Sequence, residues 1–179
     1  NKIDSNMVFV PGGEYTIVSW SLYDIPSVKL NDFHIDKYEV SNSDYKQFIS
    51  AAGYLKKEFW KHPFIKNGKE ISWADAMKLF VDRSQLPGPR SWVNQNYLDG
   101  KGNYPVTDIT WYEASAYAEF RGKSLPTVYQ WEKAARNGVI NYQGISLPWG
   151  VVYSMDNLNE RVNFNGKGTE PVNKFEFGI

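Results

Sequence analysis

The chain has 179 residues, enough to bury the core of one large domain, and 42% of them are hydrophobic. Twenty Lys and Arg balance twenty Asp and Glu, so the net charge is zero and neither nucleic acid nor an anionic membrane is an expected partner. Cysteine is absent, which excludes disulfides, zinc–thiolate sites and thiol nucleophiles within these residues. No apolar run approaches the roughly 20 residues that span a bilayer, so a soluble chain is expected, cytoplasmic or exported. It begins at Asn1 without a leader, as a processed or excised piece does.

The first predicted elements are short strands. Residues 7–18 predict two strands around a turn at Pro11-Gly12-Gly13, because Pro fixes φ and Gly permits positive φ. Residues 27–36 alternate partly between apolar and polar side chains, which predicts another pair of strands turning at Asn31-Asp32.

A helix is predicted next. Ser41 is the expected N-cap, with Asp44 three residues later as in a capping box. Gly53 is expected to end the helix. The predicted apolar face consists of Tyr45, Phe48 and Ile49.

Residues 56–103 form the least regular part of the sequence. One amphipathic stretch, residues 72–81, predicts a helix that Ser72 caps, and turns such as Asn67-Gly68 surround it. The apolar side of this helix is expected to hold Trp73, Ala76, Leu79 and Phe80. So long an irregular stretch, rich in Trp and Tyr, is typical of a functional or family-specific insertion.

Two further helices have clear start signals. Thr110 with Glu113 opens one that runs to Arg121 and stops at Gly122. Thr127 with Gln130 opens another that stops near residues 137–138, and loops with a strand or two are expected over 141–179. The two helices are predicted to bury four side chains together: Trp111, Tyr117, Leu125 and Trp131.

Six blocks of the sequence carry a family resemblance. The longest is YPVTDITWYEASAYAEFRGKSLPTVYQWEKAAR at residues 104–136. The others are MVFVPGGE at 7–14, YEVSN at 38–42, PWG at 148–150, TEPV at 169–172 and FGI at 177–179. In this order they resemble the formylglycine-generating enzyme (sulfatase-modifying factor) family over nearly the whole chain.

The resemblance implies a fold and a domain organisation. The elements already indicate an α+β class with few helices, short strands and long loops, and the resemblance implies its C-type-lectin-like variant. It further implies one domain over 1–179, C-terminally incomplete, with the insert at about 56–103. The insert and residues 123–128 look like a subgroup joined to Ser/Thr-kinase-like or hydrolase-like domains in bacterial multidomain proteins.

The resemblance also bears on function. In the family's oxidases two cysteines bind copper and perform the chemistry, in a segment that follows the last matched block. The expectation is therefore that this chain holds no catalytic residue and that copper belongs only to the missing part. One hypothesis is a non-catalytic module that binds a peptide, a sugar or a neighbouring domain. The alternative is part of a copper-dependent oxidase that converts a substrate cysteine to formylglycine in sulfatase maturation.

One segment aligns with a calcium site of related oxidases. The resemblance implies that the Asn163 side chain and the Phe164 carbonyl bind Ca²⁺, with Asn165 as the nearest substitute for a missing acidic ligand. Oxygen-only ligation suits calcium. The alternative is a plain Asn/Gly turn that holds no metal.

Aromatic residues of the insert are candidates for ligand contact. Trp60, Trp73 and Trp92 could line a groove for a peptide or sugar, and the alternative is that they pack the long loops. The two histidines, His34 and His62, have no partner at metal-ligand spacing and are expected to be structural or on the surface. Three glutamates are expected to cap or cover helices without acid–base work: Glu113, Glu119 and Glu132.

Overall fold

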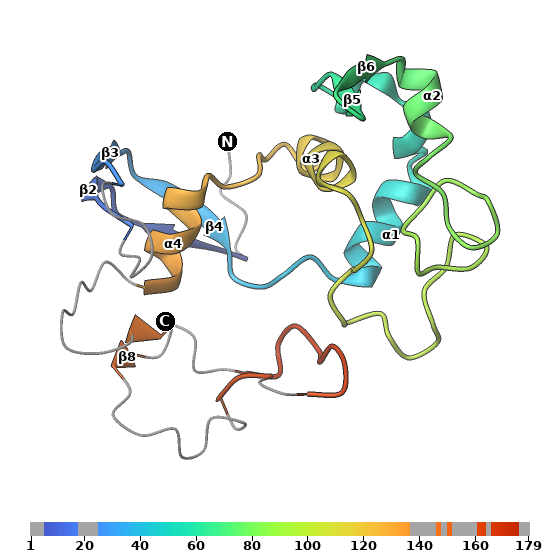
Figure 1. Cartoon of the computed structure of the whole chain (residues 1–179). Coiled ribbons are helices and arrows are strands. Elements are labelled where there is room, and N and C mark those ends of the chain that lie inside the picture. Colours follow the sequence, from blue (N-terminus) through green and yellow to red (C-terminus); the bar gives the residue numbers. More distant parts are fainter. Residues whose placement is uncertain are drawn as a thin grey trace. The chain divides into compact units, whose positions relative to one another are not determined.

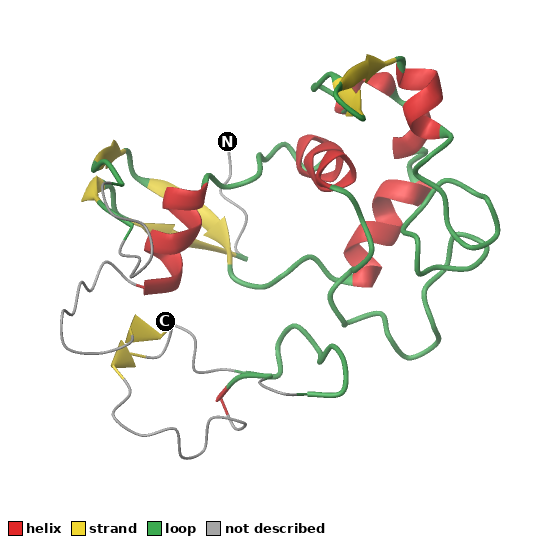
Figure 2. Cartoon of the chain, in the orientation of Figure 1, coloured by secondary structure: helices red, strands yellow, loops and turns green. Residues whose placement is uncertain are grey.

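The computed structural model shows short helices and strands separated by long loops, an α+β architecture (Figures 1 and 2). It describes residues 6–17, 25–136, 146–147, 150–151, 161–163 and 166–175. The chain divides into two compact units. The first takes residues 1–38, 126–168 and 173–179, and the second takes 39–125 and 169–172. The α+β class is confirmed, and a single domain over the whole chain stays a prediction.

The first unit begins with four short strands that lie within the predicted ranges 7–18 and 27–36, but they do not pair as predicted. They are β1 (Met7–Val10), β2 (Gly13–Tyr15), β3 (Val28–Leu30) and β4 (Phe33–Asp36). β1 pairs antiparallel with β4, and β2 with β3. The two predicted turns are therefore not hairpin turns. Pro11-Gly12 lies opposite Asn31-Asp32, where both ladders are interrupted.

Local chemistry accounts for this interruption. Pro11 has no N–H to donate to a ladder. The Gly12 amide instead donates to the Asp32 carboxylate at 2.7 Å. A Cβ on Gly12 would lie 2.4 Å from the Leu30 carbonyl oxygen, so only glycine permits the strands to approach here.

α4 (Val128–Arg136) packs against these strands. The Tyr15 hydroxyl donates to the Glu132 carboxylate, and the buried Lys133 ammonium donates to the Gly12 carbonyl at 2.9 Å. The predicted start at Thr127 is confirmed, since its N–H donates to Gln130 Oε1 at 2.9 Å. β7 (Ser146–Leu147) and β8 (Gly150–Val151) pair antiparallel in the same unit.

The second unit opens with α1 (Asn42–Ser50), capped by Ser41 as predicted. The Ser41 hydroxyl oxygen accepts from the Asp44 amide at 3.1 Å. The predicted role of Gly53 is wrong, because Ala52 takes the left-handed conformation after the helix, with φ 57°. Gly53 is required by packing instead. A Cβ there would lie 2.0 Å from the Phe48 ring.

The insert contains more regular structure than its sequence predicted. After the 3₁₀ turn η1 (Gly53–Leu55), the insert opens with a second one, η2 (Lys57–Phe59), and a hairpin of β5 (Phe64–Lys66) and β6 (Lys69–Ile71). Asn67 and Gly68 form its two-residue turn, with φ 51° and 75°. Both values are positive, as the tightest hairpin turns need, and Asn-Gly is the sequence that supplies them.

α2 (Trp73–Met77) begins where predicted and ends early. Ser72 caps it through the Asp75 amide at 3.1 Å. Because the helix stops at Met77, Leu79 does not share its buried side and is exposed, whereas Phe80 reaches the core.

A loop from residue 78 to 110 follows, drawn as an irregular segment in Figure 2. Asp82 holds its first half together, with 2% of the residue exposed. Its carboxylate accepts from the amides of Ser84, Leu86 and Gln95 at 2.7, 3.0 and 2.6 Å. The loop is thus ordered by one side chain that supplies the acceptors its backbone would otherwise lack.

α3 (Trp111–Phe120) completes the second unit and carries the predicted Thr110–Glu113 capping box. Gly122 follows it in the left-handed conformation, with φ 65°. The buried core is largely aromatic and joins α1, the insert and α3. Its large members are Tyr45, Phe48, Tyr54, Trp60, Phe64, Phe80, Trp92 and Tyr117.

The predicted joint burial of four side chains around α3 and α4 is wrong. Tyr117 is buried and Leu125 is half-buried, but Trp111 and Trp131 are 55% and 60% exposed. On α4, Glu132 and Lys133 contact the strands, whereas the Trp131 side chain is exposed. The Trp111 ring contacts only His62 and Tyr112 among the described rings.

Candidate functional site

Two of the three tryptophans proposed for ligand contact lie in the core. Trp60 and Trp92 are 7% and 3% exposed. The Trp60 indole N–H donates to the Gly53 carbonyl at 3.1 Å, and that of Trp92 donates to Asn42 Oδ1 at 3.3 Å. Trp60 also stacks on Phe80, with ring centroids 5.5 Å apart. These contacts are those of the packing alternative.

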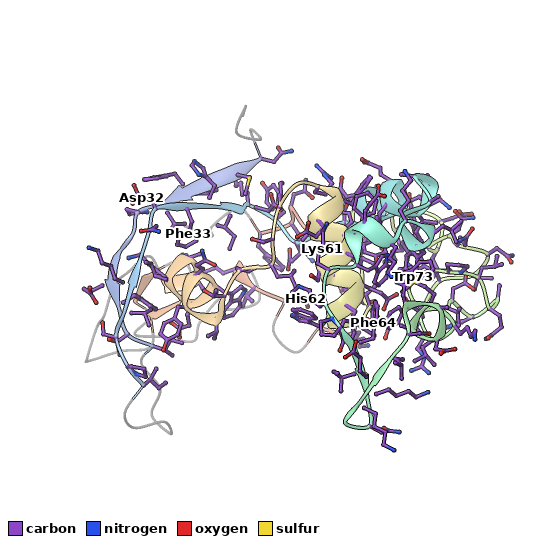
Figure 3. The ribbon with its side chains drawn as sticks, turned by 90° about the horizontal axis from the view of Figure 1, so that it is seen from above. Asp32, Phe33, Lys61, His62, Phe64 and Trp73 are labelled. Atoms are coloured by element: carbon purple, nitrogen blue, oxygen red, sulfur yellow. The ribbon has the colours of Figure 1, made fainter. Side chains whose placement is uncertain are left out.

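Trp73 is placed differently from the other two. It is the first residue of α2, half-buried against the core (Figure 3). Its indole N–H is enclosed, and no acceptor among the described residues reaches it. A buried donor without an acceptor costs about 1–3 kcal/mol. Because this N–H is enclosed, it gives no support to contact with an outside ligand, and the candidacy of Trp73 stays a prediction.

A surface beside α3 brings aromatic and cationic side chains together. The exposed His62 ring meets the Trp111 ring edge-on, with centroids 4.7 Å apart. A shallow depression, too small to enclose a water molecule, lies next to them. Its polar lining comes from Lys61, His62, Tyr112 and Ser115. Figure 3 shows Lys61, His62 and Phe64 at this place, beside α3.

Among the three glutamates considered, Glu113 lies in a buried network of hydrogen bonds. It is 3% exposed and accepts from the Tyr54 hydroxyl at 2.6 Å and from the Thr110 amide at 2.7 Å. The Tyr54 hydroxyl also lies 3.0 Å from that of Tyr45. The capping role is confirmed, and the tyrosines were missed because Tyr54 lies 59 residues earlier in the chain.

Burial sets the protonation of this network. Loss of water raises the pKa of the Glu113 carboxyl above its usual value, although its hydrogen bonds oppose the shift. Burial raises the pKa of both Tyr54 and Tyr45, so the phenols remain protonated donors. The arrangement connects α1, η1 and α3, so we assign it to stability.

The predicted calcium segment is described only in part. The Asn163 side-chain amide donates to the Gly168 carbonyl at 2.7 Å, and a Cβ on Gly166 would lie 1.8 Å from Asn163 Oδ1. Phe164 and Asn165 lie outside the described residues. The described atoms fit a turn that closes on itself, while Asn163 Oδ1 keeps lone pairs that a hard cation accepts.

The described residues contain neither a membrane-spanning helix nor a cluster of metal-binding side chains. No helix in that part of the chain has the length and apolar character needed to cross a membrane. No three His, Cys, Asp or Glu side chains in it gather where a metal ion could bind.

The described residues form an α+β fold with an aromatic core, helices that begin with capping boxes, and long ordered loops. The family described as "Sulfatase-modifying factor enzyme 1-like domain" matches residues 2–176, and the chain belongs to it. The resemblance of the six sequence blocks is thereby confirmed.

Three relatives illustrate the range of this family. Formylglycine-generating enzyme of Thermomonospora curvata is 28% identical over 172 residues, 83% of this chain and 54% of that protein. "Inactive C-alpha-formylglycine-generating enzyme 2" of Bos taurus is 28% identical over 95% of this chain and 64% of its own length. Serine/threonine-protein kinase pkn1 of Chlamydia pneumoniae is 29% identical over 75% of this chain and 20% of that protein. The chain thus spans about half the length of the formylglycine-generating enzymes it matches.

Proposed function

We propose that these residues form a non-catalytic formylglycine-generating-enzyme-like module that binds a polypeptide partner. The observation that carries the proposal is the absence of cysteine from 179 residues that the family matches almost end to end. Without a thiol these residues supply neither a thiolate ligand for copper nor a redox-active sulfur. A relative named as inactive, similar over 95% of the chain, supports a role apart from catalysis.

The partner is proposed to be a peptide or a neighbouring domain of a longer protein, with a sugar as the other ligand class. The similarity to a protein named as a kinase supports a neighbouring domain. We also propose the C-type-lectin-like variant of the α+β class, which the short strands and long ordered loops support.

The second candidate function is a part of a copper-dependent oxidase that makes formylglycine. Similarity to formylglycine-generating enzymes of Mus musculus and Thermomonospora curvata favours it. The parent gene discriminates the two, because a pair of cysteines encoded downstream of Ile179 would favour the oxidase.

A direct assay tests the proposal on the purified chain. The chain is incubated with a cysteine-containing peptide, Cu(I) and oxygen, and the peptide is examined by mass spectrometry for the aldehyde. We expect none, whereas an active formylglycine-generating enzyme under the same conditions provides the positive control. Aldehyde formed by this chain would overturn the proposal.

A further inference from the structure

The turn of the β5–β6 hairpin is a dipeptide that can react with itself. The backbone nitrogen of Gly68 can attack the side-chain amide carbon of Asn67 and close a five-membered cyclic imide. Glycine hinders this attack least, because it has no Cβ. Both residues are exposed, and a Cβ on Gly68 would meet no atom within 4 Å, so the dipeptide is open to water. In an open chain this sequence is therefore chemically labile.

The two-residue turn keeps the reacting atoms apart. Asn67 has a φ of 51° and Gly68 one of 75°, the positive values that this turn needs. The left-handed region carries a ψ of roughly +30 to +60°, which places the Asn67 Cβ and the Gly68 nitrogen on opposite sides of the Cα–C bond. A five-membered ring needs the two atoms on the same side of that bond. The closed turn therefore blocks imide formation.

Contacts at the base of the hairpin hold the turn closed. The Phe64 side chain is buried in the aromatic core, and its register partner is Ile71. The Ile65 amide donates to the Tyr112 hydroxyl at 2.9 Å, which joins β5 to α3. Figure 3 shows the hairpin projecting from its unit, with Phe64 at the base. Opening that spreads from the turn therefore breaks the bond to Tyr112 before it reaches the core.

The turn end is the weakest part of the hairpin. The register places Lys66 directly opposite Lys69, next to the turn, and like charges at opposed strand positions are destabilising. Each strand has three residues, and a hairpin this short is marginal without tertiary packing. Residues 65–70 are all exposed, so packing does little to oppose local opening at this end.

We propose that Asn67 is a self-modification site whose conversion to aspartate and isoaspartate is gated by local opening of the β5–β6 hairpin. In the open form the Gly68 nitrogen bonds to the Asn67 amide carbon. The bond from that carbon to its NH₂ group breaks, and the NH₂ group leaves as ammonia with the proton of the Gly68 nitrogen. Water then opens the imide. Its addition to the side-chain carbonyl gives aspartate, its addition to the backbone carbonyl gives isoaspartate, and neither route oxidises or reduces any atom.

The two products affect the hairpin in opposite ways. Aspartate keeps the backbone of the turn, and Asp-Gly suits this turn type as Asn-Gly does. Its carboxylate also offsets the repulsion between Lys66 and Lys69. Isoaspartate leads the backbone through the former side chain and adds a methylene group to it, so the two-residue turn and the register of the lysines are lost. Conversion to isoaspartate therefore leaves the hairpin permanently open at this end.

Timed peptide mapping by mass spectrometry tests the proposal. The folded chain is compared with a synthetic peptide of residues 62–73, and enzymatic carboxyl methylation identifies isoaspartate. Mapping is needed because Asn-Gly recurs at residues 137–138 and 165–166. We expect conversion of Asn67 in both samples, at least about tenfold more slowly in the folded chain, since only the open fraction reacts.

Matched tyrosine variants locate the gate. Tyr112→Phe keeps the ring but removes the acceptor of the Ile65 amide, and it is expected to speed Asn67 conversion in the folded chain about two- to tenfold, as the loss of one hydrogen bond does. Tyr129→Phe removes a hydroxyl that donates to a backbone carbonyl in the other unit. It is expected to change the rate less than about twofold.

A pair of double variants tests the contribution of charge. Lys66→Gln/Lys69→Gln removes the repulsion that opens the turn, so conversion in the folded chain should slow about twofold or more relative to a peptide with the same substitutions. Lys29→Gln/Lys37→Gln changes the net charge equally at two exposed positions of the other unit and should leave the rate within about twofold of wild type.

Four results would overturn the proposal. They are equal rates of Asn67 conversion in the folded chain and the peptide, equal effects of the two tyrosine variants, and faster conversion after Lys66→Gln/Lys69→Gln. The fourth is no conversion of wild type or Tyr112→Phe over a period long enough to convert the peptide many times over. All four concern the chain's own turn, so they are independent of the proposed function.

Discussion

Asp82 and Glu113 lie almost wholly out of water, and their surroundings satisfy them in different ways. All three donors to Asp82 are amides of its own loop, so this residue determines a local backbone conformation. Glu113 receives one donor from a tyrosine far away in the chain and the others from its helix start. Glu113 therefore joins elements, and its protonation affects how firmly they hold together.

Glu113→Gln tests that role through the pH dependence of stability. The pKa of Glu113 is raised by burial, so the folded chain holds this proton more tightly than the unfolded chain does. The stability that this proton contributes to the folded state is fully present below the pKa of the unfolded chain. It is lost as the pH rises through the pKa of the folded chain. Glutamine keeps an acceptor for Thr110 and carries no charge. We expect the melting temperature of Glu113→Gln minus that of wild type to rise as the pH increases from about 4, the pKa of an unfolded glutamate.

Glu119→Gln is the matched control, since Glu119 lies on the same helix and is half-exposed. A difference for Glu113→Gln that falls with pH, or that follows the Glu119→Gln profile, would contradict the assignment.

At the scale of the elements, the sequence specifies where a helix starts better than where it ends or which strands pair. The caps of α1, α2, α3 and α4 follow from Ser or Thr with Asp, Glu or Gln three residues later, a signal confined to four residues. Strand pairing across β1 and β4 depends on which distant segments meet, and no local pattern specifies it. The β5–β6 hairpin had a usable signal, Asn67-Gly68, but strands of three residues are too short to show alternation.

Glycine follows a helix for one of two reasons, close packing at Gly53 and a positive φ at Gly122. Gly53→Ala places a methyl group against the fully buried Phe48 ring, and we expect a loss of about 3 kcal/mol. Gly122→Ala meets no atom within 4 Å and is strained only by its φ of 65°, so a loss of about 1 kcal/mol is expected. Urea unfolding measures both. A larger loss at Gly122 than at Gly53 would refute the packing explanation.

The loop around Asn163 provides the test of the proposed calcium site. If Asn163 Oδ1 and the Phe164 carbonyl bind Ca²⁺ without a carboxylate, the site is weak, with a Kd of roughly 10⁻⁴–10⁻³ M. A few millimolar calcium should then raise stability by about 1–2 kcal/mol at most. Thermal melts with and without calcium measure this gain, which Asn163→Ala should abolish. A gain that survives Asn163→Ala refutes the placement, and no gain in wild type favours the plain turn.

At the scale of the whole molecule, the aromatic residues show where sequence reasoning stops. Tryptophan content indicated a packed or binding role, and local patterns could not separate the two. Trp60 is buried although its backbone is irregular, whereas Trp111 and Trp131 are exposed although they lie on well-defined helices. Burial depends on which elements meet across the chain, and that is a property of tertiary structure. The family and the α+β class, in contrast, were evident from motif order and element lengths.

The free energy of unfolding of two tryptophan variants measures this difference in burial. Trp60→Ala removes a ring stacked within the core and should cost about 3–5 kcal/mol. Trp111→Ala removes a ring that is 55% exposed and should cost less than about 1 kcal/mol. Denaturant midpoints compare the two. A Trp111→Ala loss as large as that of Trp60→Ala would show that Trp111 is covered in solution.

The contact between α4 and the first strands has a consequence for the newly made chain. Tyr15 meets Glu132 across 117 residues of sequence. On a ribosome that adds 5–20 residues per second, the first strands therefore wait roughly 6–25 s before their covering helix exists. During that time their free edges and apolar side chains are open to other nascent chains. This interval is when a chaperone would most reduce aggregation, and slower translation between residues 36 and 128 would lengthen it.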